Sequence, residues 1–317
     1  MGAVSAVLNM KRGDRMINFK CSSCGGEMTV SSTGDLVCSY CGSKSVFTDK
    51  DLSDYKNFRY RMLAYLSAIS DRSDPEETDM IWKNAEQEQF ILADGRRLSI
   101  NYLFKGKQDD VTIYTARRNV IFVFPKGDIY SAGRFQESTG RLDYPSADIK
   151  GLSEFFPLFS GSFEIAGGRT MLSVSKGEEL YPLSAFGSLP PEHTAWIISR
   201  LENLCCVLAY SDIAHNGIDI ESVFINARTH QAYLLGGWWN SSQAEGGSQN
   251  DLIMLRAAAK RLTGLNYERS PEQFKRFITE PPAKNAFDDF ALWDKVIEDG
   301  FKGRKFRKLD LLSNLNI

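Results

Sequence analysis

The sequence lacks any long hydrophobic run, because no apolar stretch approaches the roughly 20 residues that a membrane-spanning helix needs. It also lacks a charge of one sign: 38 Lys and Arg stand against 40 Asp and Glu, for a net charge of −2. No overall basic field therefore draws the chain to nucleic acid or to an anionic membrane. With 43% hydrophobic and 25% charged residues over 317 positions, we expect packed cores in about two domains.

No targeting signal is expected either. Residues 2–8 are mildly apolar, but the run is short and its positive charges follow it, whereas a secretion signal carries them in front. Ala6 stands where the myristoylation pattern requires Ser or Thr. Met16 is an alternative to Met1 as the start of the protein. We therefore expect a cytoplasmic protein that is not attached to a membrane.

Four of the six cysteines form two C-x-x-C pairs, and these are Cys21, Cys24, Cys38 and Cys41. The two-residue spacing lets both sulfurs of one turn point at the same ion, and tetrahedral zinc needs four such ligands. Gly25 and Gly42 follow the pairs, where glycine lets the turn tighten until backbone N–H groups aim at the thiolates. The pattern predicts one structural zinc ion in a zinc ribbon over residues 17–48. Free thiols or a redox pair are the alternatives.

The cysteine spacing indicates a metal ion but is compatible with two roles for the ribbon. It serves either as a metal-stapled fold that replaces a small core, or as a module that docks protein or nucleic acid. Residues 1–50 hold six Lys and Arg against four Asp and Glu, which is too small a surplus for a phosphate-binding footprint. Nucleic acid is therefore not the expected partner. Cys205 and Cys206 lie in an apolar segment and are expected to be ordinary buried thiols.

Residues 49–87 predict a helical linker, with helices over 54–70 and 76–87. The following stretch is rich in β-branched and aromatic residues, and Asp94-Gly95 and the lone Gly106 are expected to separate its strands. The expected strands cover residues 90–92, 98–104, 111–115, 120–124, 162–165 and 170–174. One helix is expected among them, near residues 146–156.

From residue 190 the apolar period becomes helical. The expected helices include residues 197–208, 251–262 and 286–300, and Gly264 is expected to close the second of them. Ser270-Pro-Glu-Gln273 is typical of a capping box that starts another helix. The fold class is therefore α+β: a zinc ribbon, a helical linker, a β-rich part and an α-rich part.

Residues 213–226 resemble the catalytic loop of protein kinases, and the matching positions are His215, Ile218, Glu221, Val223, Phe224 and Ile225. Residues 233–238 stand where the family has its metal-binding turn, and Asp251 stands on the aspartate that begins a later helix. The resemblance implies a bilobal protein-kinase-like domain over residues 88–317, with an N-lobe over 88–186 and a C-lobe over 187–317. A chance match on an unrelated α+β protein is the alternative.

The departures from the family pattern concern the residues that transfer phosphate. Phosphoryl transfer needs a lysine on the phosphates, a base near the acceptor hydroxyl, and ligands for magnesium. The resemblance matches the base to Gly217, the loop lysine to Asp219, the metal-holding asparagine to Ser222 and the metal-binding aspartate to Gly236. Val123 or Phe124 stands in place of the strand lysine. Of the phosphate-loop glycines only Gly106 remains, with Gln108 and Val111 at the other two places.

These losses imply a catalytically inactive pseudokinase that acts as a protein-interaction scaffold or regulator. A divergent ATP-dependent phosphotransferase is the first alternative, and it would recruit replacements from Asp212, Asp219, Glu221 and Lys126. A zinc-ribbon nucleic-acid-binding protein is the second. The identity of the protein partner, and whether the cleft binds any nucleotide, stay open.

A few other residues call for a decision between function and packing. Trp238 and Trp239 would either plug the nucleotide pocket or pack the seam between the lobes, and packing is favoured. His215 is expected to pack structurally, and His193 and His230 receive no role. A basic cluster near the C-terminus is expected to be a solvated helix end, with an acidic partner or RNA as the minor alternative. Its residues are Lys302, Arg304, Lys305, Arg307 and Lys308.

Overall fold

The computed structural model describes residues 19–20, 24, 27–30, 36–38, 40–45, 75–186 and 188–304. The chain divides into two compact units, Met1–Tyr65 and Leu66–Ile317. The finer boundaries expected from the sequence at residues 48, 87 and 186 stay predictions. The helix expected over residues 54–70 lies outside the described residues. No helix among those that the structure describes is long and apolar enough to cross a membrane.

The first unit contains a small antiparallel sheet of four strands in the order β1-β2-β3-β4. The strands are β1 (Phe19–Lys20), β2 (Glu27–Val30), β3 (Leu36–Cys38) and β4 (Lys44–Ser45). Cys38 pairs with Met28 across β2 and β3, so the second cysteine pair begins at a strand end.

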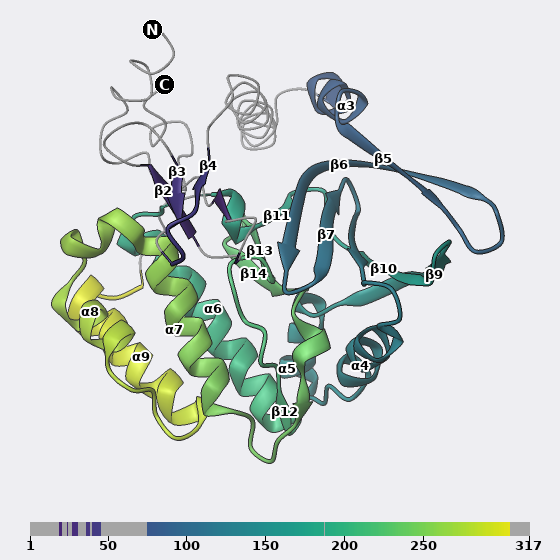
Figure 1. The fold of residues 1–317 in the computed structure, drawn as a ribbon. Helices are drawn as coiled ribbons and strands as arrows, with labels where there is room; N and C mark the ends of the chain where they lie inside the picture. Colours follow the sequence, from purple (N-terminus) through teal and green to yellow (C-terminus); the bar gives the residue numbers. More distant parts are fainter. Residues whose placement is uncertain are drawn as a thin grey trace, which may run out of the picture. The chain divides into compact units, whose positions relative to one another are not determined.

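The second unit begins with α3 (Pro75–Lys83), which ends four residues earlier than expected. A six-stranded antiparallel sheet follows, in the order β5-β6-β7-β8-β10-β9. Its strands are β5 (Glu86–Ile91), β6 (Arg97–Gln108), β7 (Val111–Ala116), β8 (Asn119–Val123), β9 (Leu158–Ile165) and β10 (Arg169–Ser175). The sheet curls until its two edges meet, because Leu92 bridges to Ile165 (Figure 1). The curl encloses a small core of its own.

Side chains alternate between the two faces of these strands, so each face packs into a different hydrophobic core. One face lines the interior of the curled sheet with Phe90, Ile100, Tyr102, Tyr114, Ile121, Val123, Ile165 and Met171. The other face turns Val120, Phe122, Leu172 and Val174 into the main core that the helices share. Every strand predicted from the sequence in this region is present, although the boundaries differ.

The two predicted turns have different outcomes. Asp94-Gly95 forms the turn between β5 and β6, as expected. The prediction for Gly106 is wrong, because Gly106 lies inside β6 and the chain turns only at Asp109. A Cβ at Gly106 would lie 2.7 Å from an oxygen of Glu221. Glycine is therefore explained here by a close tertiary approach and not by a turn.

Between β8 and β9 the chain forms α4 (Ile129–Gly140), a helix that the sequence did not reveal. The side chain of Asp128 caps it by accepting the N–H of Ser131 at 3.1 Å. Its buried face consists only of Ala132, Phe135 and Ser138, so the apolar period is too weak to recognise. The helix expected near residues 146–156 is instead a short α5 (Ala147–Lys150) followed by the 3-10 helix η1 (Gly151–Phe155).

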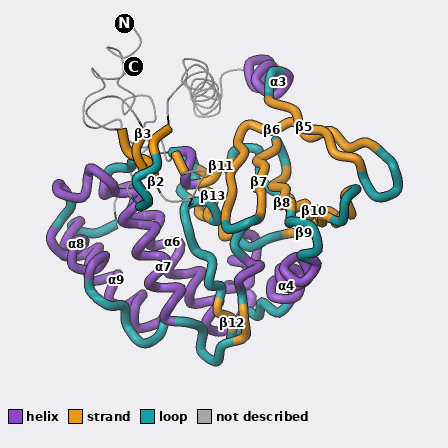
Figure 2. Tube along the Cα trace, in the orientation of Figure 1, coloured by secondary structure: helices purple, strands orange, loops and turns teal. Residues whose placement is uncertain are grey.

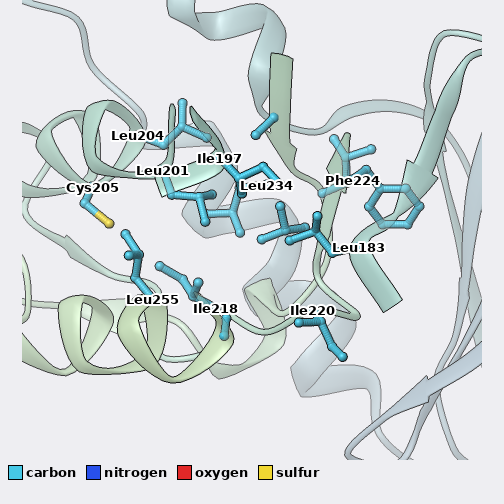
Figure 3. Packing of buried hydrophobic residues seen from close by; sticks show 14 of the residues in the cluster. Leu183, Ile197, Leu201, Leu204, Cys205, Ile218, Ile220, Phe224, Leu234 and Leu255 are labelled. Atoms are coloured by element: carbon cyan, nitrogen blue, oxygen red, sulfur yellow. The ribbon is translucent and has the colours of Figure 1, made fainter. Parts of the chain in front are cut away.

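The last third of the chain is mainly helical, and Figure 2 shows its helices gathered apart from the curled sheet. The helices are α6 (Pro191–Tyr210), α7 (Gln249–Thr263), α8 (Glu272–Thr279) and α9 (Ala286–Phe301). A short sheet joins β11 (Leu180–Pro182), β13 (Val223–Asn226) and β14 (Gln231–Leu234), and β12 (Ile213–Ala214) pairs with β15 (Ser242–Gln243). The result is a mixed fold in which a curled sheet and a helical part are segregated, as the α+β prediction requires.

The predicted helix ends are partly right. Gly264 follows the last residue of α7, as expected. The capping box at residues 270–273 is wrong, since α8 begins at Glu272 without a side-chain cap. The hydroxyl of Ser270 donates instead to the carbonyl of Asn266 at 3.2 Å. The hydroxyl that the pattern assigned to the helix cap is therefore bonded to the neighbouring 3-10 helix, η4 (Gly264–Arg269).

Candidate functional site

The described cysteines of the first unit form a cluster. The sulfurs of Cys24, Cys38 and Cys41 all lie within 4.8 Å of one another, and those of Cys24 and Cys38 are 3.5 Å apart. Four sulfurs bound to zinc at about 2.3 Å lie roughly 3.8 Å apart, so the cluster has the right dimensions. The three cysteines therefore lie close enough to hold a metal ion. Cys21, the predicted fourth ligand, lies outside the described residues.

The turn that carries the second cysteine pair has the geometry of a thiolate-binding loop. The N–H of Gly42 donates to the carbonyl of Cys38 at 3.0 Å, and the N–H of Cys41 donates to the Cys38 sulfur at 3.5 Å. Gly42 has φ +71°, in the left-handed region that favours glycine. The N–H group that approaches a sulfur in this turn thus belongs to Cys41, whereas that of Gly42 meets a carbonyl; a role of these groups toward a metal-bound thiolate stays a prediction. Such N–H contacts stabilise the negative sulfur that a zinc ion requires.

In the second unit, the loop after β12 lies directly against the turn after β14. A Cβ added to Gly217 would lie 2.5 Å from the carbonyl oxygen of Gly237, and a Cβ added to Gly237 would lie 2.4 Å from that of Gly217. Gly237 also has φ +82°. No side chain fits at either position. The tertiary structure thus brings together the two segments that the kinase resemblance pairs, and leaves no space at the position matched to the base.

Asp251 anchors this loop from the start of α7. Its carboxylate accepts the N–H of His215 at 2.8 Å and the N–H of Asn216 at 2.7 Å. Burial raises the pKa of Asp251 to about 6, and the two N–H donors oppose that rise. His215 is fully buried, with its ring 4.6 Å from that of Trp238. This burial and ring contact agree with the predicted packing role of the histidine, and burial lowers the pKa of His215 to about 3.

Residues 219–222 close a tight turn with their own side chains. The hydroxyl of Ser222 accepts the N–H of Asp219 at 2.8 Å and donates to the carbonyl of Asp219 at 2.9 Å. The Asp219 carboxylate pairs with Arg261 of α7 at 2.6 Å. A Cβ at Gly236 would lie 3.1 Å from Cα of Ser222. Asp219 and Ser222 therefore shape the loop, and Gly236 is packed against it.

Strand β6 lies on this loop through alternate residues. Phe104 contacts Tyr181 with ring centroids 5.6 Å apart, and Gly106 approaches Glu221 as described above. Two residues further on, the amide of Gln108 donates to the carbonyl of Gly217 at 2.9 Å. Because residues i, i+2 and i+4 of a strand share one face, the whole end of β6 rests on the loop.

The turn between β6 and β7 is held in the same way. The carboxylate of Asp109 accepts the indole N–H of Trp239 at 3.0 Å and the amide of Asn240 at 2.8 Å. Asp109 has φ +52°, a conformation that aspartate tolerates better than most residues. We call the contacts of Gln108 and Asp109 with residues 217, 239 and 240 the hairpin latch.

Behind the latch, an aromatic cluster joins the sheet to α4. The ring of Trp239 lies 5.7 Å from that of Phe122, 5.8 Å from Phe124 and 6.1 Å from Phe135 of α4. Trp238 and Trp239 are both buried, and Trp238 contacts the ring of Phe156. Both tryptophans therefore pack among aromatic side chains, as the favoured packing interpretation expected, while the division into two lobes stays a prediction.

The other residues considered from the sequence have local partners. The side chain of Asp212 accepts the N–H of Gly246 at 2.8 Å, and Glu221 accepts the hydroxyl of Ser184 at 3.0 Å. Lys126 extends along Gly168 at the end of the sheet. Cys205 is buried and Cys206 half-buried. Asp212, Asp219 and Glu221, three of the replacements considered for a divergent enzyme, thus already serve local structure.

Two predictions about isolated residues need comment. His193 and His230 are far apart in the sequence, but their rings lie 6.3 Å apart, and His230 stacks on Trp196 at 4.6 Å. Only the tertiary structure brings them together. Of the basic cluster, Lys302 ends α9 and Arg304 pairs with Asp294. The remaining three basic residues lie outside the described part of the chain.

No protein-family model matches the sequence, and no curated protein matches it. Among solved structures, that of vaccinia related kinase 3 is similar to this chain at 14% sequence identity. The match covers 72% of this chain and 83% of that chain, with a TM-score of 0.41.

Proposed function

We propose that residues 88–317 form a protein-kinase-like domain that binds a protein partner without transferring phosphate. The N-lobe would cover residues 88–186 and the C-lobe residues 187–317. The strand order β6-β7-β8-β10-β9, with α4 inserted between β8 and β9, supports this fold. The loop anchored by Asp251 supports it further, because the resemblance places an aspartate at the start of that helix.

One observation carries the non-catalytic part of the proposal. The hairpin latch contacts the loop after β12, and in this loop Gly217 touches Gly237 of the turn after β14. Magnesium-bound ATP needs a cavity between the hairpin and the loop, lined by a lysine and by magnesium ligands. In this chain the hairpin is hydrogen-bonded to the loop itself. A phosphotransferase would have to break the latch and still find a base and metal ligands elsewhere.

The zinc ribbon over residues 17–48 completes the proposed architecture. We propose that Cys21, Cys24, Cys38 and Cys41 hold one structural zinc ion, with Cys21 as the fourth ligand. The ion would supply the cohesion that strands of two to four residues cannot provide through a core of their own. The scaffold role, with a protein partner at either domain, follows from the loss of chemistry and from the absence of a strong basic field.

A thermal-shift series with ATP, with and without magnesium, tests this function. We expect no magnesium-dependent shift. A site filled at about a hundred times its Kd would raise the Tm by about 5–10 °C, so occupancy would be easily seen. The matched variants are Asp219→Asn and Glu221→Gln. A magnesium-dependent shift that either substitution abolishes would establish the divergent phosphotransferase instead.

Retention on nucleic acid is the test of the second alternative. We expect no retention of the zinc-loaded full chain on immobilised DNA or RNA at low salt. Binding that falls steeply as salt rises would indicate phosphate contacts and would favour the nucleic-acid-binding interpretation.

A further inference from the structure

The core of the helical part contains three charged side chains from three different helices. They are Glu202 of α6, Arg256 of α7 and Asp289 of α9, with exposed fractions of 0%, 4% and 0%. Burying a charge is costly unless it is paired and fully hydrogen-bonded. The arrangement of this charged cluster therefore needs an explanation that packing alone does not supply.

Two members of the cluster compensate each other. Arg256 donates to the Asp289 carboxylate at 2.6 Å and to the carbonyl of Glu280 at 2.5 Å. Its guanidinium also lies 4.0 Å from the ring centroid of Phe277. The oxygen of Asp289 that binds Arg256 accepts the N–H of Ala283 at 2.7 Å. One cation and one anion are thus matched, which leaves Glu202 without a cation of its own.

The ion pair between Arg256 and Asp289 leaves the Glu202 carboxyl without a cationic partner of its own. Neither of its carboxyl oxygens has a hydrogen-bond partner among the described residues, and the same holds for Oδ2 of Asp289. If both carboxyls were ionised, two negative charges would share one guanidinium inside the core. A proton on one carboxyl would remove the excess charge and would also supply an O–H donor for a bare oxygen of the other.

We propose that Glu202 keeps its proton at neutral pH, and that this buried acid makes the helical part less stable as the pH rises. Burial raises the pKa of Glu202 well above its usual value, the charge of Asp289 raises it further, and Arg256 lowers it. The other titratable groups that act on this site are the thiols of Cys205 and Cys206 on α6.

Those thiols do not compete for the proton. Burial raises the pKa of Cys206 to about 12 and that of Cys205 in the same direction, so both thiols stay neutral. Asp251 of α7 also acts on Cys205, but its carboxylate is held by two backbone N–H groups and it titrates near pH 6. The excess negative charge of the cluster therefore falls on the Glu202–Asp289 pair.

The sign of the pH effect follows from linkage. A carboxyl whose pKa in the folded state lies above its unfolded value of about 4.3 binds more protons when folded. Its contribution to stability is complete below that unfolded value and is lost as the pH rises through the folded value. Over this window the unfolding equilibrium constant rises by up to about tenfold for each pH unit.

Urea unfolding of the full chain from about pH 5 to about pH 9 tests the proposal, followed by tryptophan fluorescence. All five tryptophans, at positions 82, 196, 238, 239 and 293, belong to the second unit, so the signal reports that unit alone. In Glu202→Gln the amide keeps the shape and a donor but cannot ionise. We expect its unfolding constant relative to that of the unsubstituted protein to fall as the pH rises. Parallel pH profiles would overturn the proposal.

Two further measurements keep the result unambiguous. Glu298→Gln removes an exposed carboxyl on α9, and we expect it to leave the pH profile unchanged. The folded, unsubstituted protein should show the infrared band of a protonated carboxylic acid at a pH above the titration of Asp251. If Glu202→Gln failed to fold, the absence of this band near neutral pH would still refute the protonated state of Glu202.

Discussion

Substituting Gly217 by alanine tests whether the loop after β12 lies against the turn after β14. The added Cβ would lie 2.5 Å from the carbonyl oxygen of Gly237, whereas ordinary contacts of a Cβ lie at 3.4 Å or beyond. The two backbones would therefore have to separate by almost 1 Å. The hydrogen bond from Gln108 to the Gly217 carbonyl would be strained by the same movement.

The expected loss of stability follows from these two effects. Overpacking a well-packed core costs about 1–3 kcal/mol, and a weakened buried hydrogen bond adds about 0.5–1.5 kcal/mol. A total of about 2–4 kcal/mol in a unit of this size lowers the Tm by about 5–15 °C. Differential scanning fluorimetry on the zinc-loaded full chain measures this shift.

Gly133→Ala is the matched control for that experiment. Gly133 lies inside α4, and a Cβ there would have no neighbour within 4 Å. The alanine should be neutral or stabilising by about 0.5–1 kcal/mol, because it only reduces backbone freedom. Equal Tm values for Gly217→Ala and the unsubstituted protein would refute the closed arrangement. Gly217→Asp, which restores the carboxylate of an active kinase, should destabilise the unit without creating phosphotransferase activity.

Three further outcomes are expected. His215→Gln should make the free energy of unfolding less dependent on pH between about pH 3 and about pH 6.5. Burial lowers the pKa of His215 in the folded state. The contribution of the neutral histidine to stability is therefore complete above the unfolded pKa of about 6.5 and is lost as the pH falls. Urea titrations at several pH values measure this, and an unchanged profile would contradict the burial argument. Cys38→Ser should reduce bound zinc well below one ion per chain in elemental analysis, whereas Cys206→Ser should retain it; equal zinc content in both would exclude the cysteine cluster. Asp109→Ala should destabilise the second unit by about 1–3 kcal/mol, because it leaves the buried indole N–H of Trp239 unpaired, whereas Asp110→Ala next to it should change stability by less than about 0.5 kcal/mol.

The sequence predicted those parts of the fold that depend on short-range patterns. The strands of the curled sheet are rich in β-branched and aromatic residues, and Asp94-Gly95 is a turn because its local chemistry favours one. The cysteine pairs point to a metal because two residues of spacing suffice to aim two sulfurs at one ion. The resemblance of residues 213–238 to a kinase loop was also accessible, since these residues form one continuous stretch of chain.

The errors fall where a residue serves a distant partner. Gly106 resembled a turn, but it lies inside β6, where a Cβ would meet the end of the Glu221 side chain from a distant part of the sequence. α4 was missed because only three of its residues are buried, and two of these are alanine and serine. Ser270 fits a capping box in sequence, but the preceding 3-10 turn uses its hydroxyl. None of these partners can be identified from local spacing.

The sequence by itself determined the order of most elements, their alternation or helical period, and the departures of residues 217–236 from the kinase pattern. The tertiary structure alone decided that Gly217 and Gly237 touch, that Asp109 reaches Trp239, and that Glu202, Arg256 and Asp289 of three different helices are buried. The physical reason is the distance over which each effect acts. Backbone sterics and periodicity act within a few residues, whereas the exclusion of water from the core brings distant side chains together.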